Sequence, residues 1–282
     1  ERVTQMSDLT RKYIADLDAG VRDLFASDRW KNYLDFLSRF HRYSANNTIA
    51  IYLQRPTASL VASFSDWRRK GRNVKKGEHG IKILAPHTVK DVDDDTGEIK
   101  QRLGFHIAYC FDVSQTDGKD LPEGPAHQLT GTVDGFARIW DTLLAVSPVP
   151  VSVEPITDCE ANGYYSHADQ RIVVRDGLAE LQHVKTAIHE IAHAMLHAKG
   201  AEEADADRST REVQAESVAY VVCRALGLDT SDYSFGYVAG WSADKELKAL
   251  KASLDCIVRT SDKILKAFEP SENNSGRETS AA

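Results

Sequence analysis

The chain has 282 residues, of which 42% are hydrophobic and 27% charged, an ordinary composition for a soluble globular protein with room for two domains. Its four cysteines lie far apart and form no Cys-x-x-Cys pair, which indicates neither a disulfide framework nor a thiolate zinc site. The sequence has no run of 18 apolar residues and no secretory signal layout, so we expect a cytoplasmic protein without a membrane partner.

Charge is unevenly distributed along the chain. Residues 29–90, which we call the basic segment, hold 13 lysines and arginines against three acidic residues, a net charge of +10. Because the net charge of the chain is −7, the remaining residues carry −17. A local excess of this size indicates a surface for a polyanion, even in an acidic protein.

Amphipathic helices followed by a β-hairpin are predicted in the N-terminal half. Pro56 ends the third helix, because proline disfavours helical geometry in the residue before it. Residues 71–80 form a glycine-bounded basic loop, and the acidic turn 93–97 separates the two hairpin strands. The predicted elements are helices at 5–25, 28–40 and 44–53, a strand at 59–63, a helix at 64–70, and strands at 81–89 and 105–113.

A stretch rich in glycine and proline, residues 117–131, is the best linker in the chain. It predicts one domain over residues 1–120 and a second over 131–270, with a polar, disordered tail at 271–282. In the second domain we expect helices at 133–144, 178–198, 209–226 and 237–268 and strands at 149–153, 164–165 and 171–174, with Gly200 ending the second of these helices. The fold class is therefore α+β: a basic helix-and-hairpin domain joined to a mainly helical domain with a small β-sheet.

The predicted helix 178–198 carries the sequence His-Glu-x-x-His. Residues four apart lie on one face of a helix, so His189 and His193 can offer imidazole nitrogens to one metal ion while Glu190 projects beside them. A catalytic zinc ion needs a third protein ligand and one open position for water. We favour Glu212 as this ligand and Glu216 as the acceptor that orients a ligating histidine, with the reverse assignment left open.

The same motif predicts a mechanism. Zinc lowers the pKa of bound water, and Glu190 would act as the general base. Donors to a developing oxyanion would be Tyr164, Tyr165 or Tyr237, and His197 is expected in an outer shell or on the surface. A domain that binds metal without hydrolysing a substrate is the main alternative, and Mn²⁺ or another divalent ion could replace Zn²⁺.

Basic and aromatic residues alternate in the basic segment. Grooves that bind single-stranded nucleic acid combine cations that follow phosphates with aromatic faces on which bases stack. The alternative is that Trp30, Tyr33, Phe40 and Trp67 are core residues and that the charges form a solvated face. A core position is favoured for each of these aromatic residues taken singly, whereas a solvated face fits poorly with a charge of +10 concentrated around a glycine loop.

Three stretches resemble the N-terminal domain of ArdC-type antirestriction proteins. They are Phe40-His41-Arg42-Tyr43-Ser44-Ala45-Asn46-Asn47, then Gln54-Arg55-Pro56, then Trp67-Arg68-Arg69-Lys70-Gly71-Arg72-Asn73-Val74-Lys75-Lys76-Gly77-Glu78-His79-Gly80-Ile81, within a match over residues 28–115. In that family this domain binds single-stranded DNA, and the C-terminal half is a zincin-like metallopeptidase domain related to the ImmA/IrrE proteases. Residues 189–197 and 212–216 are similar to both families.

The resemblance implies an antirestriction protein of a plasmid or other mobile element that binds single-stranded DNA and carries a gluzincin-like metallopeptidase domain. A protein substrate or a restriction enzyme would be a further partner. Around the second histidine the chain looks more like ImmA/IrrE, so a regulatory zinc protease that cleaves a DNA-bound repressor stays open. The residues expected to contact DNA are Arg39, Arg42, Tyr43, Asn47, Arg55, Trp67, Arg68, Arg72, Lys75 and Lys76.

Overall fold

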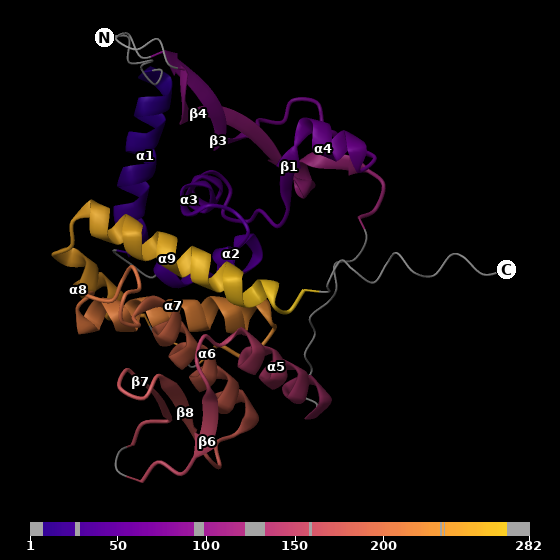
Figure 1. The fold of residues 1–282 in the computed structure, drawn as a ribbon. Helices are drawn as coiled ribbons and strands as arrows, with labels where there is room; N and C mark the ends of the chain where they lie inside the picture. Colours follow the sequence, from indigo (N-terminus) through magenta and orange to yellow (C-terminus); the bar gives the residue numbers. More distant parts are fainter. Residues whose placement is uncertain are drawn as a thin grey trace. The chain divides into compact units, whose positions relative to one another are not determined.

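The computed structural model describes residues 8–25, 29–92, 99–121, 133–157, 160–231, 233 and 235–269. Helices and strands are mixed throughout, so the α+β class is confirmed (Figure 1). The chain divides into two compact units, the first formed by residues 1–126 with 233–258 and the second by 127–232 with 259–282. No helix in the described ranges combines the length and apolarity needed to cross a membrane. The predicted acidic turn 93–97 and tail 271–282 fall largely or wholly outside those ranges.

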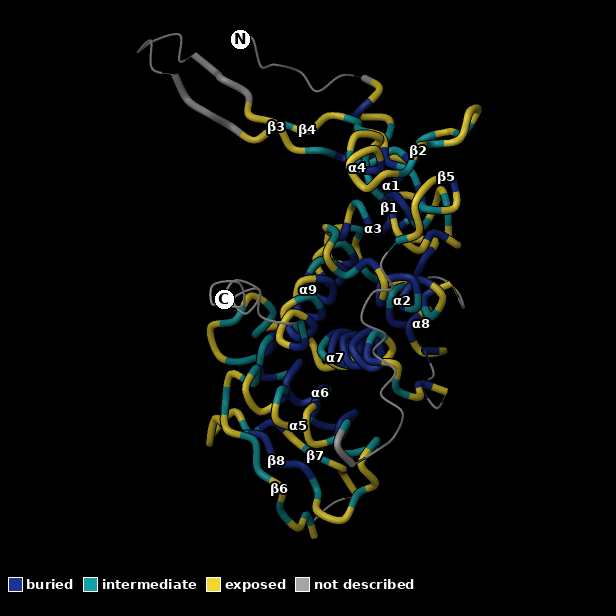
Figure 2. The backbone as a smooth tube through the Cα atoms, turned by 90° about the vertical axis from the view of Figure 1, so that its right-hand side faces the viewer, coloured by how far each residue is buried: buried dark blue, intermediate teal, exposed yellow. Residues whose placement is uncertain are grey.

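Helices α1 (Asp8–Phe25), α2 (Arg29–Phe40) and α3 (Ala45–Gln54) open the first unit, as the apolar spacing predicts. Helix α2 is buried on most sides (Figure 2), because its aromatic residues pack against both neighbouring helices and loops. The Phe36 and Phe40 rings stack at 4.3 Å, and the Tyr33 hydroxyl lies 2.7 Å from the Thr48 hydroxyl of α3. Trp30 and Tyr33 are therefore core residues.

A three-stranded sheet of order β1-β4-β3 follows, with β1 at Val61–Ser63, β3 at Ile81–Val92 and β4 at Ile99–Asp112. Strands β3 and β4 pair antiparallel, which confirms the predicted hairpin. Strand β3 is an edge strand, and two amides of α3 cover part of that edge. Asn47 exchanges hydrogen bonds of 2.9 and 3.0 Å with the Leu84 backbone, and Gln54 does the same with the Lys82 backbone at 2.9 Å.

The predicted basic loop contains a strand that the sequence analysis missed. Helix α4 (Phe64–Arg69) ends before β2 (Arg72–Val74), which pairs antiparallel with β5 (Thr116–Gly118) beyond the short 3₁₀ helix Val113–Gln115. Only three residues of each strand pair, too few to produce a visible alternation of apolar and polar residues.

The prediction of one long helix over residues 237–268 is wrong. The structure has α8 (Val238–Ala243) and α9 (Leu247–Lys266). Asp244 caps the end of α8, and Ala249 and Leu250 both donate to the Glu246 carbonyl as a new helix begins. Aspartate competes with helical hydrogen bonds and favours helix ends, but no glycine or proline marks this break. Residues 233–258 also belong to the first unit, whereas the predicted second domain ran without interruption to residue 270.

The second unit is built on a small sheet of order β6-β8-β7. Its central strand β8 (Arg171–Arg175) pairs parallel with β6 (Val151–Glu154) and antiparallel with β7 (Gly163–Ser166). Ile172, Val173 and Val174 are at most 1% exposed, as expected for a strand covered on both faces. Helices α5 (Val133–Val146), α6 (Glu180–Leu196) and α7 (Arg208–Ala225) belong to this unit, together with the end of α9 from Arg259 onward.

Helix α6 ends earlier than predicted. Its last capping residue is His197, whose backbone N–H donates to the His193 carbonyl. Gly200 has a φ of +87° and lies in the turn beyond the helix, so it does not form the helix end itself. Glycine is favoured there because other residues rarely adopt positive φ.

Candidate functional site

Helix α6 carries the His-Glu-x-x-His motif and is anchored through its apolar residues. Buried side chains line it on more than one face: Val184, Ala187, Ile188, Ile191, Ala192, Ala194 and Leu196. Glu180 lies in the first turn, where a negative charge stabilises the positive end of the helix dipole. This rigid frame brings the rings of His189 and His193 to a centroid separation of 4.7 Å.

Helix α7 supplies the carboxylates that face this motif. Its N-cap residue is Asp207, whose side chain accepts hydrogen bonds from the backbone N–H of Thr210 and, at 2.8 Å, from the Thr210 hydroxyl. This N-cap fixes the first turn, and Glu212 follows one turn later. Helix α7 contacts α6 and has eleven buried residues, so Glu212 and Glu216 project from a fixed element.

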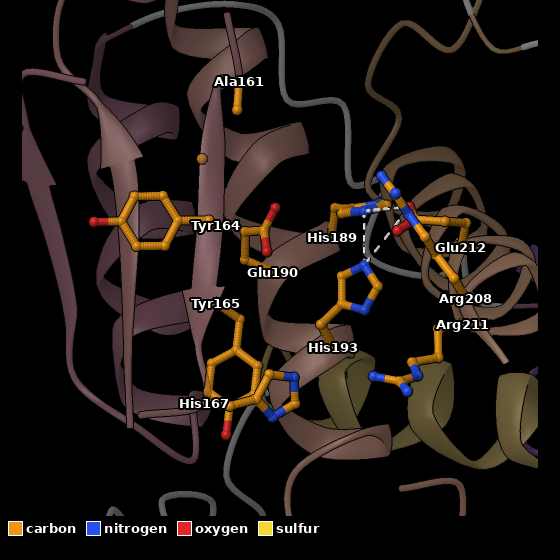
Figure 3. Close-up of a pocket in the computed structure, with 11 residues that line it drawn as sticks. Ala161, Tyr164, Tyr165, His167, His189, Glu190, His193, Arg208, Arg211 and Glu212 are labelled. Carbon is orange, nitrogen blue, oxygen red and sulfur yellow. Dashed lines mark hydrogen bonds and ion pairs between the residues drawn. The ribbon is translucent and has the colours of Figure 1, made fainter. Parts of the chain in front are cut away.

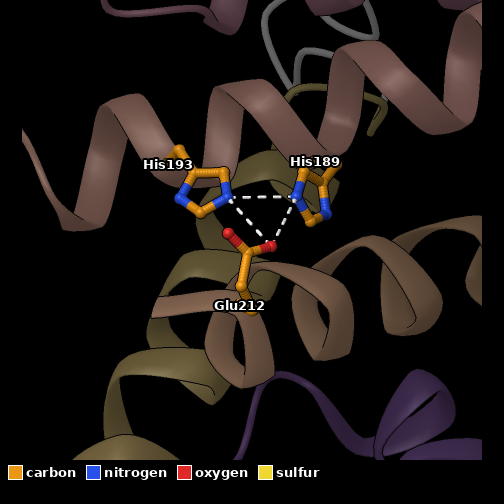
Figure 4. A group of neighbouring side chains, drawn as sticks. All are labelled: His189, His193 and Glu212. Carbon is orange, nitrogen blue, oxygen red and sulfur yellow. Dashed lines mark hydrogen bonds and ion pairs between the residues drawn. The ribbon is translucent and has the colours of Figure 1, made fainter. Parts of the chain in front are cut away.

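His189, His193 and Glu212 converge on one point (Figure 4). The Nε2 atoms of the two histidines are 3.0 Å apart, and the Glu212 Oε2 atom lies 3.5 Å from one and 3.8 Å from the other. A tetrahedral ion with ligand bonds near 2.0–2.2 Å holds its ligand atoms roughly 3.3–3.6 Å apart. The donor set and its spacing therefore fit a divalent cation.

The second nitrogen of each histidine also has a partner. His189 Nδ1 lies 3.2 Å from the Glu216 Oε2 atom, and His193 Nδ1 lies 2.9 Å from His197 Nδ1. The structure thus places Glu212 at the Nε2 atoms and Glu216 behind His189. Contacts of this kind hold the ring of a metal-binding histidine in one orientation.

Electrostatics couple these groups strongly. Burial alone would lower the pKa of His189, but hydrogen bonds to Glu212 and Glu216 outweigh burial and raise this pKa to about 10. The hydrogen bonds to His189 and His193 hold the pKa of Glu212 well below its usual range. A site of this kind attracts a positive charge, which a proton on His189 or a bound metal ion can supply.

Glu190 lies beside the convergence point, on the wall of a pocket of about 560 Å³ (Figure 3). The pocket is lined by Ala161, Gly163, Tyr164, Tyr165, His167, His189, Glu190, His193, Arg208, Arg211 and Glu212. Glu190 is 8% exposed and accepts a hydrogen bond from the Tyr165 backbone. Burial raises the pKa of its carboxyl group.

Gly163 allows strand β7 to approach helix α6 at this pocket. A Cβ atom at position 163 would lie 2.5 Å from Thr186 Cγ2, 2.9 Å from the Val173 carbonyl oxygen and 3.5 Å from Glu190 Cγ. Any larger residue would push the strand away from the motif helix. The close approach is what lets the Tyr165 backbone reach Glu190.

The three tyrosines predicted as donors lie in different surroundings. Tyr164 and Tyr165 both line the pocket, whereas Tyr237 belongs to the first unit. The Tyr164 ring is turned away from the two histidines (Figure 3), and the Tyr165 hydroxyl accepts a 2.9 Å hydrogen bond from Gln170. The pocket also contains two arginines that the sequence analysis missed, Arg208 and Arg211.

Of the two expected positions for His197, the structure gives the outer shell, behind His193, and not the surface. His197 is 1% exposed, and burial lowers the pKa of its imidazole to about 4. Its Nε2 atom lies 2.8 Å from the Gln214 Oε1 atom of α7. The Leu-His pair that follows the motif gives no sign of this partner, which lies 17 residues further along the chain.

Several residues predicted to contact DNA instead hold the first unit together. Trp67 is fully buried, and its indole N–H donates to the Phe111 carbonyl, so its ring cannot stack on a base. The guanidinium group of Arg72 donates to the Thr116 hydroxyl and carbonyl and to the Lys119 carbonyl, which joins β2 to β5. The amide of Asn47 is paired with β3, as described above.

Three more residues of the predicted DNA-binding set make hydrogen bonds within the first unit. The Tyr43 hydroxyl donates to the Val61 carbonyl, and its ring packs on a core that contains Phe36, Phe40, Ile51, Ala58, Val61, Ile81 and Cys110. Arg55 donates to the Ser114 hydroxyl at 3.2 Å, and Lys75 donates to the Ser114 carbonyl at 3.0 Å. The exposed members of the predicted set are Arg39, Arg42, Arg68 and Lys76, together with Lys75.

Exposed aromatic rings accompany these cations in the first unit. Phe105 and Tyr109 are 42% and 53% exposed and lie on the same face of β4, because side chains alternate along a strand. Phe64, 51% exposed, contacts Phe111 of that face with ring centroids 6.4 Å apart. The sequence predicts only an apolar strand here, although the series Phe105, Ile107, Tyr109 and Phe111, with a period of two, marks one face of that strand.

Comparison with known proteins identifies the N-terminal region of the first unit. Residues 4–114 match the model of the N-terminal domain of anti-restriction factor ArdC. These residues are an ArdC N-terminal domain. The ArdC protein of plasmid R388 has a similar structure over more of the chain. Its metal-free form has a TM-score of 0.55 at 19% identity and covers 80% of this chain and 85% of that protein.

The Mn(II)-bound structure of R388 ArdC gives a TM-score of 0.52 at 17% identity and covers 83% of this chain and 97% of that protein. At these identities the likeness establishes an ArdC-type fold. A protein of Bacillus anthracis, uncharacterized protein pXO2-81, is 27% identical over 283 residues and matches 83% of this chain. The chain spans about half of that relative's length, 48%. The chain is thus ArdC-type in its N-terminal domain and in its fold.

Proposed function

We propose that this chain is an antirestriction protein that binds single-stranded DNA through its ArdC N-terminal domain and a divalent metal ion in its second unit, where it hydrolyses peptide bonds. One observation carries the second part: His189, His193 and Glu212 converge within a pocket that also contains Glu190. R388 ArdC has an Mn(II)-bound structure, which supports the binding of a divalent ion by this chain as well. Zn²⁺ suits the same two imidazoles and one carboxylate.

The positions of the ligands and of Glu190 suggest a role for each residue in hydrolysis. A divalent ion held by His189, His193 and Glu212 would supply a Lewis acid and an acidic bound water. Glu190 would accept a proton from that water, since its carboxylate lies in the pocket wall and burial raises the pKa of that carboxyl group, which makes it a stronger base. The Tyr165 backbone N–H holds this carboxylate in place. Glu216 keeps the His189 ring oriented from behind.

Hydrolysis is tested by Glu190→Gln in the metal-loaded full chain, assayed on a mixed peptide library. Loss of a general base lowers turnover by roughly 10²–10⁴-fold, and the metal affinity should change little because Glu190 is not among the converging ligands. Glu180→Gln, the same chemical change on an exposed position of the same helix, is the matched control. Equal turnover of wild type and Glu190→Gln would reject this role, and a wild type that binds metal but cleaves nothing would indicate a non-hydrolytic metal domain.

The DNA-binding part is supported by the exposed cations and rings of the first unit. Arg68 and Lys76 are exposed members of the basic segment, and Phe64 of α4 and Phe105 and Tyr109 of β4 are exposed rings of the same unit. Cations of this kind neutralise phosphates, and exposed rings stack on bases of any sequence. Double-stranded DNA does not present its bases for such stacking, so we favour single strands.

Binding of a fluorescent mixed-sequence oligonucleotide tests this assignment. The binding constant should fall with salt, and the Arg68→Gln/Lys76→Gln variant should reduce the slope of log K against log salt by about 1.4, two phosphate contacts on a single strand. Lys248→Gln, an exposed lysine of the first unit outside the basic segment, is the control and should leave the slope unchanged. Salt-independent binding, or an unchanged slope in the double variant, would rule out the proposed surface.

A further inference from the structure

A continuous line of hydrogen bonds runs from the metal-facing histidine His193 to the turn that follows helix α6. His193 Nδ1 lies 2.9 Å from His197 Nδ1, and His197 Nε2 lies 2.8 Å from Gln214 Oε1. The Gln214 Nε2 atom in turn donates to Glu203 Oε2 at 3.1 Å. His197 is 1% exposed and Gln214 is fully buried, so these polar groups have no access to bulk water.

The direction of every bond in this line follows from its last member. A carboxylate only accepts hydrogen bonds, so the Gln214 atom that faces Glu203 must be the amide nitrogen. The Gln214 carbonyl oxygen then faces His197 and accepts, which requires a proton on His197 Nε2. The neutral His197 ring therefore has its lone pair on Nδ1, and the bond between the two histidines requires a proton on His193 Nδ1.

We propose that Glu203, Gln214 and His197 are positioning residues that set the tautomer of His193. With its proton on Nδ1, His193 keeps the lone pair of Nε2 free, and this atom faces His189 Nε2 and Glu212 Oε2. The opposite tautomer would point an N–H at the ligand position and could not bind a cation. This inference rests on the metal centre proposed above and assigns a role to three residues outside it.

The two histidines of the motif are thereby oriented by equivalent means. Glu216 lies directly behind His189 Nδ1 at 3.2 Å. Among the described residues no carboxylate contacts His193 Nδ1 in this way, but Glu203 acts at the same nitrogen through Gln214 and His197. His197 caps the end of α6, Gln214 lies in α7, and Glu203 lies in the turn between the two helices. The orientation of His193 and the packing of α6 on α7 therefore depend on the same side chains.

A role in packing alone makes a different prediction from a role in tautomer control. Removal of a packing residue lowers the stability of the fold and leaves the intrinsic metal affinity of the folded protein unchanged. Reversal of the hydrogen-bond direction lowers metal affinity even where the fold is retained. Changes in groups behind a ligating histidine typically cost roughly 10- to 100-fold in metal affinity.

The sharpest variant is Glu203→Lys in the full chain, which replaces the terminal acceptor with a donor. A lysine there favours the turned Gln214 amide and, through His197, the wrong tautomer of His193. Glu202→Lys is the matched control, since it makes the same charge change one residue earlier, in a side chain that pairs with Arg259 instead. We expect the Zn²⁺ dissociation constant of Glu203→Lys to rise roughly 10- to 100-fold and that of Glu202→Lys to rise by at most about threefold.

A second pair covers the case in which Glu203→Lys fails to fold. Gln214→Met removes the polar relay with little change in size, and Val218→Ala, on the same buried face of α7, destabilises the helix packing without touching the relay. Only Gln214→Met should weaken Zn²⁺ binding. In the metal-free wild type, the nitrogen resonances of the His193 ring should report a protonated Nδ1 and an unprotonated Nε2, and Gln214→Met should mix the two forms.

Unchanged affinity in both Glu203→Lys and Gln214→Met, or a wild-type His193 ring protonated on Nε2 alone, would overturn the relay while leaving the metal centre in place. A wild type that binds neither Zn²⁺ nor Mn²⁺ would instead remove the metal centre itself, and the relay with it. Weakened binding confined to the two relay variants supports the proposal.

Discussion

His189 lies between two carboxylates of the candidate metal centre. It contacts Glu212 and Glu216, at 3.5 and 3.2 Å, and these hydrogen bonds raise its pKa from 6.5 to about 10 against the effect of burial. In the metal-free protein His189 is therefore protonated at neutral pH, and this proton supplies the positive charge that a metal ion would otherwise supply. Metal binding must displace this proton, so proton release and metal affinity are coupled.

This coupling predicts how the stability of the metal-free chain depends on pH. Because the pKa of His189 is higher in the folded than in the unfolded state, its contribution to stability is complete below pH 6.5 and disappears as pH rises to about 10. Denaturant unfolding in the presence of a chelator should show stability falling over this window. His189→Gln should show a flatter profile in the same window, and parallel profiles for the two proteins would contradict the assigned pKa.

Helix α3 and strand β3 illustrate how an element can depend on a few polar groups. Exposed strand edges invite pairing with other chains, and natural proteins cover them. Here Asn47 and Gln54, two turns apart on α3, use their amides as substitutes for a neighbouring strand at Leu84 and Lys82. Asn47, the second asparagine of the Asn46-Asn47 pair within the ArdC resemblance, therefore has a structural role in covering the edge of β3.

We predict that Asn47→Ala destabilises the chain by about 1–3 kcal/mol, because it removes the side-chain partner of the partly buried Leu84 backbone N–H and C=O. Urea unfolding measures this loss. Asn46→Ala, an exposed neighbour on the same helix, should change the free energy of unfolding by no more than about 0.5 kcal/mol. Equal effects of the two substitutions would show that the edge contacts contribute nothing to stability.

At the scale of the whole molecule, the long periodic elements were predictable and the short or distant ones were not. Helices α1, α2, α3, α6 and α7 and the β3–β4 hairpin follow from apolar residues that recur at helical or strand spacing over long stretches. The β2–β5 pair joins residues more than 40 positions apart through three residues each, and the three residues between α8 and α9 include no glycine or proline. The return of residues 233–258 to the first unit is likewise a tertiary event that no local pattern records.

The candidate site shows the same division. His189, Glu190 and His193 follow from helical spacing, and Glu212 and Glu216 from a second helix with the same four-residue step. His197 lies a further four-residue step along and was expected in an outer shell or on the surface, whereas Gln214 and Glu203 join it only after α6 and α7 pack, so neither spacing nor composition identifies those two. Trp67 shows the reverse error: an aromatic residue within a basic segment is read as a ligand contact until its burial is known.

The joining of an ArdC N-terminal domain to a metal centre in one chain is tested most directly by titration of the metal-free full chain with Zn²⁺ or Mn²⁺, followed by calorimetry. The account predicts one high-affinity ion per chain, lost in His193→Ala and retained in His167→Ala, a histidine that lines the same pocket outside the converging group. Absence of binding in the wild type, or equal binding in His193→Ala, would contradict it.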